Sequence, residues 1–455
     1  MRNLNRNIIV LIGVILSIYL ILSIYFSNHF FMNTVINGVD VSLESYADFN
    51  AIIKDFINDY ELQIIEKSGE TEKIYGKEIG LKYNEKNSLN ISYKQNPFKW
   101  IKSLTKVQEY FIKDLYVIKN NSFNNRINKL KCLNKEIIEP KNVSFKYTNG
   151  LYEAVKEIYG NKINKDKLIK EISICILNGD AKLDLYNNKC YMNPNPKYTL
   201  FSDKTIKVLN LLNKYVKSKI TYLFGIKYEI LDGQIINKWI SVDDNLDIII
   251  DEKAAVKYVL GLSNKYDTVG IERNFKTSTG KIVKVKGGLY GWKINLFGET
   301  LALLDNIKNG ATIIKEPLYA QKAYSRDIND IGSTYVEINI TKQHIWFYKN
   351  GKLITHGSVV TGNPNKGNST VTGTYMLNYR QNNATLKGES YEVKVSYWMP
   401  FYGSIGIHDA TWRYSFGGEI YKTNGSRGCV NAPFYLAKRI FENIEEGIPI
   451  ICYEE

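Results

Sequence analysis

The clearest hydrophobic pattern is a long apolar run at the start of the chain. Residues 8–26 are almost entirely Ile, Leu, Val, Tyr and Phe, and residues 7–39 contain no Asp, Glu, Lys or Arg. About 19 helical residues at about 1.5 Å each span about 28 Å, which is enough to cross the hydrocarbon core of a membrane.

The sequence around this run indicates how it is oriented. Arg2 and Arg6 precede it, which places the N-terminus in the cytoplasm. A cleaved signal peptide is the alternative, but the run is longer than a typical signal-peptide core and no small-x-small cleavage site follows. We therefore expect residues 1–32 to form a cytosolic tip and an uncleaved, single-pass transmembrane helix, with the rest of the chain outside the cytoplasm.

Beyond this run, apolar positions recur with helical and strand periods in alternation. Spacing near 3.6 residues predicts helices, and alternation with period two predicts strands. A hairpin turning at Thr279-Gly280 is expected within residues 275–285. The mixture predicts two α+β regions, at 33–228 and 229–328. Helices are expected around 45–59, 95–118, 166–177, 202–217 and 252–263, and strands around 61–66, 72–79 and 181–186.

Residues 329–455 are rich in strand patterns. Residues 335–340 alternate with period two, and Asn350-Gly351 is a strong hairpin signal between apolar stretches. A helix is expected at 433–443 and a last strand at 449–453. These elements predict a compact β-sandwich-like domain.

The charge of the chain restricts its partners. A formal net charge of +14 calls for an anionic partner, such as nucleic acid, acidic lipid headgroups or a cell-wall polymer. The basic residues are spread along the chain, without zinc-finger spacing or a long Lys/Arg run. We therefore expect no nucleic-acid partner.

The five cysteines give no sign of a metal site. They form no CxxC pair and no metal-like cluster with the four histidines, so we expect no metal and no cofactor. Cys175 and Cys190 can pair, but buried free thiols are the expected state. His344 and His356 are interpreted as surface or packing residues.

Two short motifs in the C-terminal domain carry candidate chemistry. A cysteine beside a glycine, on a turn entering a helix, suits a nucleophile because Gly428 permits a tight backbone whose amides can face an oxyanion. Arg427 can stabilise the Cys429 thiolate, and His408 can supply the base. On spacing alone, a buried packing cysteine remains the alternative. The motifs are Ile407-His408-Asp409 and Gly425-Ser426-Arg427-Gly428-Cys429-Val430-Asn431.

Together these motifs resemble the signature of L,D-transpeptidases of the YkuD type. That signature is a His, 17 intervening residues (409–425 here), then Ser-x-Gly-Cys-hydrophobic-Asn. Thr361-Gly362 and residues 370–373 match the family as well, and the resemblance covers residues 333–453. It implies a YkuD-type fold and a cysteine acyltransferase of peptidoglycan biosynthesis.

The resemblance also implies a mechanism. Cys429, activated by His408, attacks the carbonyl of the third residue of a tetrapeptide stem and expels the terminal D-Ala. The side-chain amine of another stem's diamino acid then takes the acyl group, which gives a 3→3 cross-link. Backbone amides at Arg427, Gly428 and Cys429 hold the oxyanion, and a backbone carbonyl near His408 orients the base. Ser426 orients the motif loop, which ends at Asn431.

The sequence departs from the family pattern at two positions. Arg427 stands where many members carry a second His, and Asp409 where Gly or Ser is frequent. Tyr402, Trp412 and Arg413 flank His408 and, with Asp409, are the expected substrate-binding residues. Aromatic packing and a solvated charge are the alternatives for them.

Three stretches before the catalytic domain resemble the peptidoglycan-binding modules of Gram-positive wall enzymes. The resemblance implies wall-facing modules that bind the wall or hold the catalytic domain away from the membrane. An anionic wall polymer is a further expected partner, and a spacer without a ligand is the alternative. The stretches are Asn37-Gly38-Val39-Asp40, residues 76–81 read as a strand, and Gly287-Gly288-Leu289-Tyr290-Gly291-Trp292.

Two other functions fit the same motifs. An L,D-carboxypeptidase would use water instead of an amine as acceptor, and no motif separates the two reactions. A non-catalytic wall-binding protein would have no need to keep His408, Ser426, Gly428 and Cys429 together.

Overall fold

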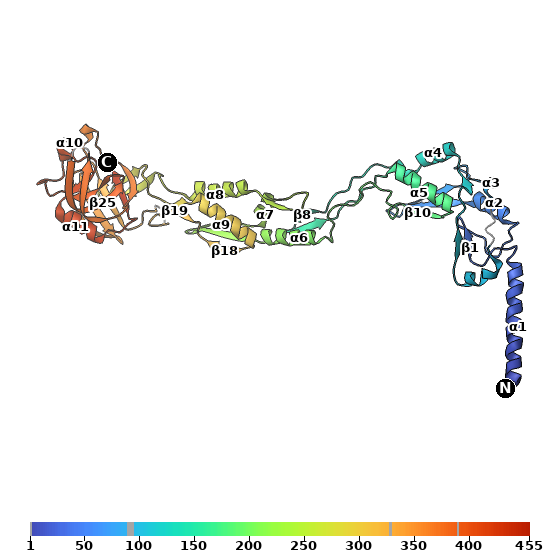
Figure 1. Ribbon diagram of the computed structural model, residues 1–455. Helices are drawn as coiled ribbons and strands as arrows, with labels where there is room; N and C mark the ends of the chain where they lie inside the picture. Colours follow the sequence, from blue (N-terminus) through green and yellow to red (C-terminus); the bar gives the residue numbers. More distant parts are fainter. Residues whose placement is uncertain (1, 89–94, 327–329, 389–390) are drawn as a thin grey trace. The chain divides into compact units, whose positions relative to one another are not determined.

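The computed structural model describes residues 2–88, 95–326, 330–388 and 391–455 (Figure 1). It divides into two compact units: unit 1 is Met1–Ser144 with Val155–Thr205, and unit 2 is Phe145–Ala154 with Ile206–Glu455. The expected division at 228/229 falls inside strand β12 (Lys227–Leu231), which pairs along its length with β11 (Lys219–Phe224). That pairing keeps residues 219–231 together. The expected division at 328/329 lies outside the described residues.

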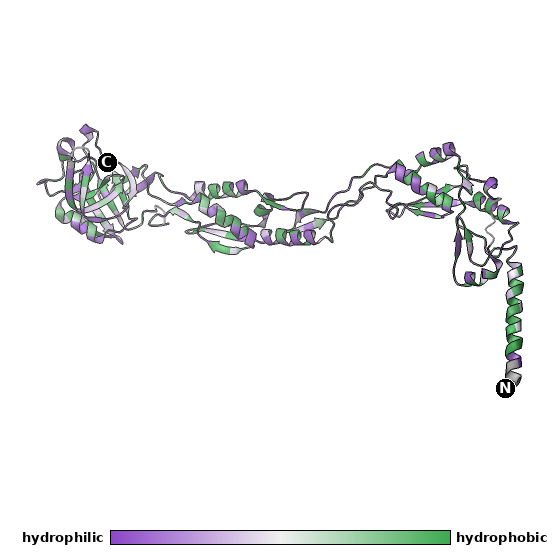
Figure 2. Ribbon diagram, viewed as in Figure 1, coloured by the Kyte–Doolittle hydropathy of each residue, from purple (hydrophilic) through white to green (hydrophobic). Residues whose placement is uncertain are grey.

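Helix α1 (Arg2–Tyr25) is the apolar run. Among the described residues it is the one helix long and apolar enough to cross a membrane. Figure 2 colours it as hydrophobic along most of its length, and Ile9 and Ile24 are 68% and 73% exposed. Immediately after it, Phe26 is buried against Phe31 and Trp100. The end of the apolar helix is therefore part of the folded unit 1.

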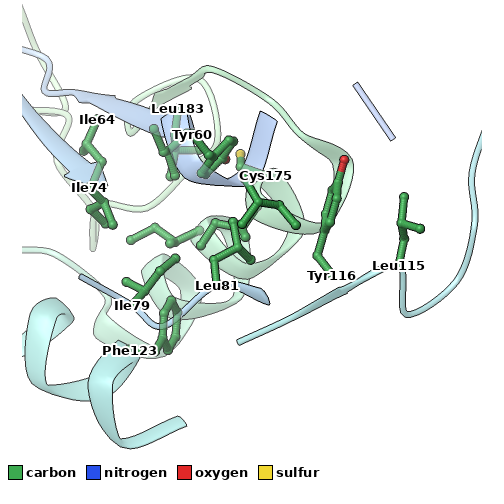
Figure 3. Packing of buried hydrophobic residues seen from close by; sticks show 14 of the residues in the cluster. Tyr60, Ile64, Ile74, Ile79, Leu81, Leu115, Tyr116, Phe123, Cys175 and Leu183 are labelled. Atoms are coloured by element: carbon green, nitrogen blue, oxygen red, sulfur yellow. The ribbon is translucent and has the colours of Figure 1, made fainter. Parts of the chain in front are cut away.

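The main core of unit 1 lies between helices and a three-stranded sheet. The strand order is β10-β3-β4, with β3 antiparallel to β4 and parallel to β10. Figure 3 shows how side chains from these strands meet those of the helices, among them Ile64, Ile74, Leu183 and Cys175. The elements are α2 (Phe49–Asp59), β3 (Glu61–Ile65), β4 (Thr71–Tyr75), α4 (Asn120–Asn128), α5 (Lys165–Asn178) and β10 (Lys182–Asp184).

Unit 2 repeats this connectivity. A helix leads into a hairpin, and the first hairpin strand pairs in parallel with a strand that follows a later helix. Both later helices are capped alike: Asn164 and Asn295 accept N-terminal amides, and Gly179 and Gly310 end them in the left-handed region. The elements are α6 (Asp203–Val216), β11, β12, α8 (Glu252–Tyr266), α9 (Leu296–Asn309) and β18 (Thr312–Lys315).

Two local expectations in unit 1 are wrong. Residues 95–118 form a 3₁₀ helix, η1 (Pro97–Leu104), and strands β6 (Gln108–Tyr110) and β7 (Tyr116–Val117) instead of α-helices. Apolar Phe98, Ile101 and Leu104 recur every three residues, which matches the three residues per turn of a 3₁₀ helix. Residues 76–80 form a turn rather than a strand.

One hairpin crosses between the units in the chain. Strands β8 (Ser144–Thr148) and β9 (Leu151–Val155) contain the segment assigned to unit 2. There the amide of Tyr152 donates to Asn213 Oδ1 at 2.8 Å, and Asn213 Nδ2 donates to the Tyr152 carbonyl at 3.1 Å. The chain therefore passes from one unit to the other three times.

The C-terminal domain is a β-sandwich, as expected. One sheet has the order β22-β21-β20-β28-β23 and the other β24-β25-β26-β27, and the core holds residues of both, such as Val336 and Ile407. Helix α11 (Phe434–Asn443) packs against this core. The strands are β20 (Tyr335–Asn339), β21 (His344–Lys349), β22 (Lys352–Ser358), β23 (Gly373–Met376), β24 (Gln381–Gly388), β25 (Tyr391–Tyr402), β26 (Ile405–Asp409), β27 (Val430–Ala432) and β28 (Pro449–Tyr453).

The expected hairpin, β15 (Arg273–Lys276) and β16 (Ile282–Val285), packs on this sandwich. Its Phe275 joins a buried cluster with Tyr453. At its tip, the Ser278 amide and hydroxyl donate to the buried Glu337 carboxylate at 2.9 and 2.6 Å. The glycine-rich stretch 287–292 also packs on the sandwich, since the Tyr290 amide donates to the Thr374 carbonyl of β23 at 3.0 Å. That stretch is therefore used in packing.

The remaining elements are short. They are β1 (Thr34–Ile36), β2 (Val39–Asp40), β5 (Lys82–Tyr83), α3 (Glu85–Ser88), η2 (Lys131–Leu133), α7 (Gly233–Ile236), η3 (Asn237–Trp239), β13 (Ile240–Val242), β14 (Ile248–Ile250), β17 (Lys293–Ile294), β19 (Tyr319–Gln321), η4 (Pro364–Lys366) and α10 (Ile420–Asn424).

Candidate active site

Two parallel strands bring the separated motifs together. Strand β26 carries His408 and pairs in parallel with β27, in a register that sets His408 opposite Asn431. Cys429 comes directly before β27, so it lies two residues before Asn431, the partner of the histidine. The cysteine therefore enters a strand of three residues, and the expectation of a turn entering a helix is wrong.

The loop before the cysteine is held by the segment that follows β22. The Ser426 amide donates to the Thr361 carbonyl at 2.9 Å, and Thr370 Oγ1 donates to the Gly428 carbonyl at 2.7 Å. Gly428 has φ +113°, a conformation that disfavours any other residue. A Cβ on Gly362 would lie 2.9 Å from the Gly428 Cα, so the two segments can approach this closely only because residue 362 is a glycine.

Ser426 braces the loop from within. Its hydroxyl donates to the Cys429 carbonyl at 2.5 Å and accepts from the Gly428 amide at 3.1 Å. These bonds tie the Ser426 side chain to the two residues before β27, and its role in orienting the loop stays a prediction. They also commit the Gly428 amide, which would have to leave Ser426 before it could hold an oxyanion.

A chain of three side chains decides the tautomer of His408. Arg413 Nε can only donate, so the Asn431 atom 3.0 Å from it is the carbonyl oxygen. The Asn431 amide nitrogen then faces His408 Nε2 at 2.9 Å, and because an amide nitrogen also only donates, Nε2 is the acceptor. The ring proton is therefore on Nδ1, which donates to the Asp409 carbonyl at 2.9 Å.

The nucleophile and base are both uncharged at neutral pH. Burial raises the pKa of the Cys429 thiol to about 11, against the opposing effect of the Gly406 amide. Burial also lowers the pKa of His408, while the Asp409 carbonyl acts in the other direction. The thiol donates a weak hydrogen bond to the Ser404 carbonyl, with 3.5 Å between sulfur and oxygen. The resting pair is a thiol and a neutral imidazole.

A pocket of about 230 Å³ joins these groups. Trp412 stands beside the base, with 5.9 Å between its ring centroid and that of His408. The structure does not place Asp409 and Tyr402 among the lining residues: the Asp409 carboxylate accepts from the Tyr397 amide at 2.8 Å, and the Tyr402 ring packs 5.1 Å from Tyr375. The described lining residues are Leu386, Val393, His408, Trp412, Arg413, Ser426, Arg427, Cys429 and Asn431.

Sequence reasoning missed two groups of site residues. Leu386 and Val393 reach the pocket from β24 and β25, and Ser404 and Gly406 contribute backbone groups to the thiol. The hairpin register, with Leu386 opposite Val393, is the feature that brings the first pair together. These contacts depend on strand register and on backbone groups, which motif spacing does not predict.

Known families and solved proteins match large parts of the chain. The family described as L,D-transpeptidase catalytic domain (YkuD) matches residues 333–452. A crystal structure of a mutant Enterococcus faecium L,D-transpeptidase is 31% identical over 100% of its own chain and 54% of this one, with a TM-score of 0.46. The chain belongs to the L,D-transpeptidase family.

Two further matches concern separate parts of this L,D-transpeptidase. The isolated catalytic domain of the E. faecium enzyme, also solved acylated by ertapenem, is 37% identical over 98% of its chain and 27% of this one, with a TM-score of 0.25. A family described as "putative peptidoglycan binding domain" matches residues 73–184 and 199–314, which contain most of the two structural repeats. No curated protein matches the chain.

Within the described part of this L,D-transpeptidase, no group of three or more His, Cys, Asp or Glu is arranged to hold a metal ion. His344 and His356 lie on β21 and β22, with their ring nitrogens 3.0 Å apart. Their burial and mutual repulsion lower the pKa of His344.

Proposed function

We propose that this chain is a peptidoglycan L,D-transpeptidase that forms 3→3 cross-links through a Cys429 acyl-enzyme. The observation that supports this most directly is the fixed tautomer of His408. The unprotonated nitrogen is Nε2, whose lone pair accepts from the Asn431 amide in the resting state, and the imidazole lines the same pocket as the Cys429 thiol. Once Nε2 exchanges the Asn431 amide for the thiol, its lone pair can take the thiol proton.

In the first step, the Cys429 proton moves to His408 Nε2 as sulfur attacks the carbonyl of the third stem residue. The carbon–nitrogen bond to the terminal D-Ala breaks, and the leaving amine takes the proton from the imidazolium. Because Asn431 holds Nε2 in the resting state, that hydrogen bond has to lengthen when the thiol turns toward the ring.

In the same step, negative charge develops on the carbonyl oxygen. Motif amides at Arg427, Gly428 and Cys429 are the proposed donors, each worth about a hundred-fold or more in rate. The Gly428 amide can contribute only after it exchanges its Ser426 partner for the oxyanion.

In the second step, the side-chain amine of an acceptor stem attacks the thioester, loses a proton to His408 and releases Cys429. Water in place of the amine would give an L,D-carboxypeptidase, and a silent site would leave a wall-binding protein. The partly apolar lining of the pocket, with Leu386, Val393 and Trp412, favours an organic acceptor over water alone.

We also propose that α1 is a retained membrane anchor with the bulk of the chain facing the wall. The Tyr25 hydroxyl donates to the Leu43 carbonyl at 3.1 Å, and Phe26 is 1% exposed. A cleaved signal peptide has no need of such contacts with the mature fold. The two repeats would bind the wall, with their excess of Lys and Arg favouring an anionic polymer.

Mass spectrometry of products from purified tetrapeptide stems tests the reaction. We expect the wild type to release D-Ala and form cross-linked dimers, and Cys429→Ala to form none. Cys190→Ala, which removes a buried thiol of unit 1, is the matched control and should behave as wild type. Tripeptides without dimers would assign a carboxypeptidase, and dimers from Cys429→Ala would refute the nucleophile.

A further inference from the structure

The 3₁₀ helix η1 has three distinct faces, because a 3₁₀ helix repeats every three residues. Trp100 and Ser103 face the protein and are 8% and 0% exposed. Phe98, Ile101 and Leu104 share a second face and are 58%, 53% and 49% exposed. Lys99 and Lys102 lie on the third face and are exposed. An exposed apolar face beside a basic one is typical of a segment that lies in a membrane interface.

The position of η1 against α1 points to the same environment. The Tyr19 hydroxyl donates to the Phe98 carbonyl at 2.8 Å, and the Tyr19 ring centroid lies 6.1 Å from that of Trp100. Tyr19 precedes Phe26 by seven residues, which is about 10 Å along a helix axis. If α1 spans a membrane that ends near Phe26, η1 lies between that boundary and about 10 Å below it, because Trp100 packs against Phe26 as well as Tyr19. This is within the depth reached by interfacial helices.

A groove between η1 and α1 offers a place for a ligand. It has a volume of about 390 Å³ and is lined by residues of α1 from Ile12 to Tyr19 and by Trp100 and Ile101. The Trp100 indole nitrogen is buried and has no acceptor among the described residues. Lysines on the face of η1 beside the groove can reach toward a lipid phosphate.

We propose that η1 and the outer half of α1 form a phospholipid-binding surface in the outer leaflet of the membrane. An acyl chain occupies the groove, and the headgroup phosphate lies near Lys99 and Lys102. This proposal rests on the proposed anchoring by α1. With two membrane contacts instead of one, unit 1 cannot rotate freely about its anchor.

Depth-dependent fluorescence quenching tests the proposal on the full chain in phosphatidylglycerol–phosphatidylethanolamine vesicles. An environment-sensitive probe is attached to Ile101→Cys in a Cys429→Ala background, in which the remaining cysteines are buried. The matched control is Ile137→Cys, an isoleucine of unit 1 that is 58% exposed, close to the 53% of Ile101. We expect lipids with a doxyl group at carbon 5 to quench the Ile101 probe at least about twofold more than the Ile137 probe.

A third probe at Val14→Cys separates the proposal from the anchor on which it rests. If doxyl lipids quench Val14 but not Ile101, and iodide quenches Ile101, the anchor stands and the lipid surface is refuted. If Val14 is not quenched either, both proposals fail. If Ile101 is shielded from doxyl lipids and from iodide, a second copy of α1 fills the groove, and the proposal is overturned.

The basic face is tested by charge reversal. Lys99→Glu with Lys102→Glu should reduce quenching of the Ile101 probe in vesicles containing phosphatidylglycerol and change little in phosphatidylcholine vesicles. Lys129→Glu with Lys131→Glu reverses two exposed lysines elsewhere in unit 1 and should have no effect. Equal quenching for both double variants would refute the headgroup contact.

Discussion

At the scale of single residues, Arg413 is linked to His408 through Asn431, and its positive charge also lowers the pKa of His408. Its guanidinium contacts the Asn431 oxygen at 3.0 Å and the Asn424 carbonyl at 2.7 Å. The sequence marks Arg413 as a residue near the base, with substrate binding as the expected role. The structure engages it with protein groups, which favours positioning of the asparagine amide.

Arg413→Leu should therefore lower kcat about ten-fold, equivalent to about 1.4 kcal/mol of transition-state stabilisation, and leave KM nearly unchanged. The physical reason is that a free Asn431 amide can rotate and present its oxygen to Nε2, which disfavours the reactive tautomer. Steady-state kinetics with tetrapeptide stems measures kcat and KM separately. Arg439→Leu on α11, an exposed arginine, is the control. A raised KM with a normal kcat would instead assign Arg413 to substrate binding.

The pH dependence of Cys429 follows from its pKa of about 11. Alkylation by iodoacetamide should be slow at pH 7 and rise about ten-fold per pH unit up to about pH 10, because only the thiolate reacts. Since burial and the Gly406 amide set this pKa, Arg427→Ala should leave the alkylation profile unchanged and raise KM for the stem instead. Stopped-flow alkylation measures this, and a profile shifted by Arg427→Ala would assign Arg427 to the thiol.

The fall of the transpeptidation rate in acid should depend on the pKa of His408 instead of that of Cys429. Because the pKa of His408 is lowered from its ordinary value of 6.5, most of the imidazole is still neutral at pH 6.5. The acid limb of kcat/KM should therefore fall only below that pH, and Asn431→Asp should move the limb to higher pH because a carboxylate beside Nε2 stabilises the imidazolium. A pH–rate profile of both enzymes checks this. An acid limb above pH 6.5 in the wild type would contradict it.

The sequence could indicate Cys429, His408 and Asn431 because their types and spacing form one motif. It could not indicate how Asn431 is oriented, since that depends on the donor that Arg413 supplies from another turn of the chain. Nor could the sequence show whether the side chain or the backbone carbonyl of Asp409 contacts the base. The carbonyl contacts the base, and the carboxylate faces Tyr397.

At the scale of elements, the β15–β16 hairpin couples the second repeat to the catalytic sandwich. Glu337 is fully buried, and its carboxylate accepts from Ser278 and from the Tyr453 hydroxyl at 2.6 Å. A buried carboxylate that loses a donor costs more than the hydrogen bond itself. The hairpin tip therefore contributes to the stability of the catalytic domain.

Ser278→Ala should lower the free energy of unfolding by about 1–3 kcal/mol. Urea denaturation followed by circular dichroism gives the change in midpoint and slope. Ser241→Ala, an exposed serine on β13, is the control and should change stability by less than about 0.5 kcal/mol. Equal midpoints for the two variants would mean that solvent already satisfies Glu337.

Sequence patterns predicted this hairpin and most long helices because each has a clear period or turn signal. They did not predict what the hairpin packs against. The error at 95–118 has a similar origin, since apolar residues three apart fit two helix types. Only the contact of Trp100 with Tyr19 and Phe26 shows which face is covered.

At the scale of the whole molecule, the net charge of +14 predicts salt-dependent wall binding. The screening length falls from about 10 Å at 0.1 M salt to about 3 Å at 1 M, so binding to purified walls should weaken over that range. Co-sedimentation of the full-length Cys429→Ala protein measures it without turnover. Walls stripped of anionic polymer are the control, and salt-independent pelleting would point to recognition of the glycan or peptide instead.

The hairpin that crosses between the units changes how proteases can process this protein. Because residues 145–154 belong to unit 2 and residues 155–205 return to unit 1, a single cut between 199 and 205 leaves residues 145–154 attached to the N-terminal fragment. That fragment is still bound to unit 2 through Tyr152 and Asn213. Shedding of the catalytic unit into the medium would therefore need a second cleavage or local unfolding, and one nick would leave the enzyme in place.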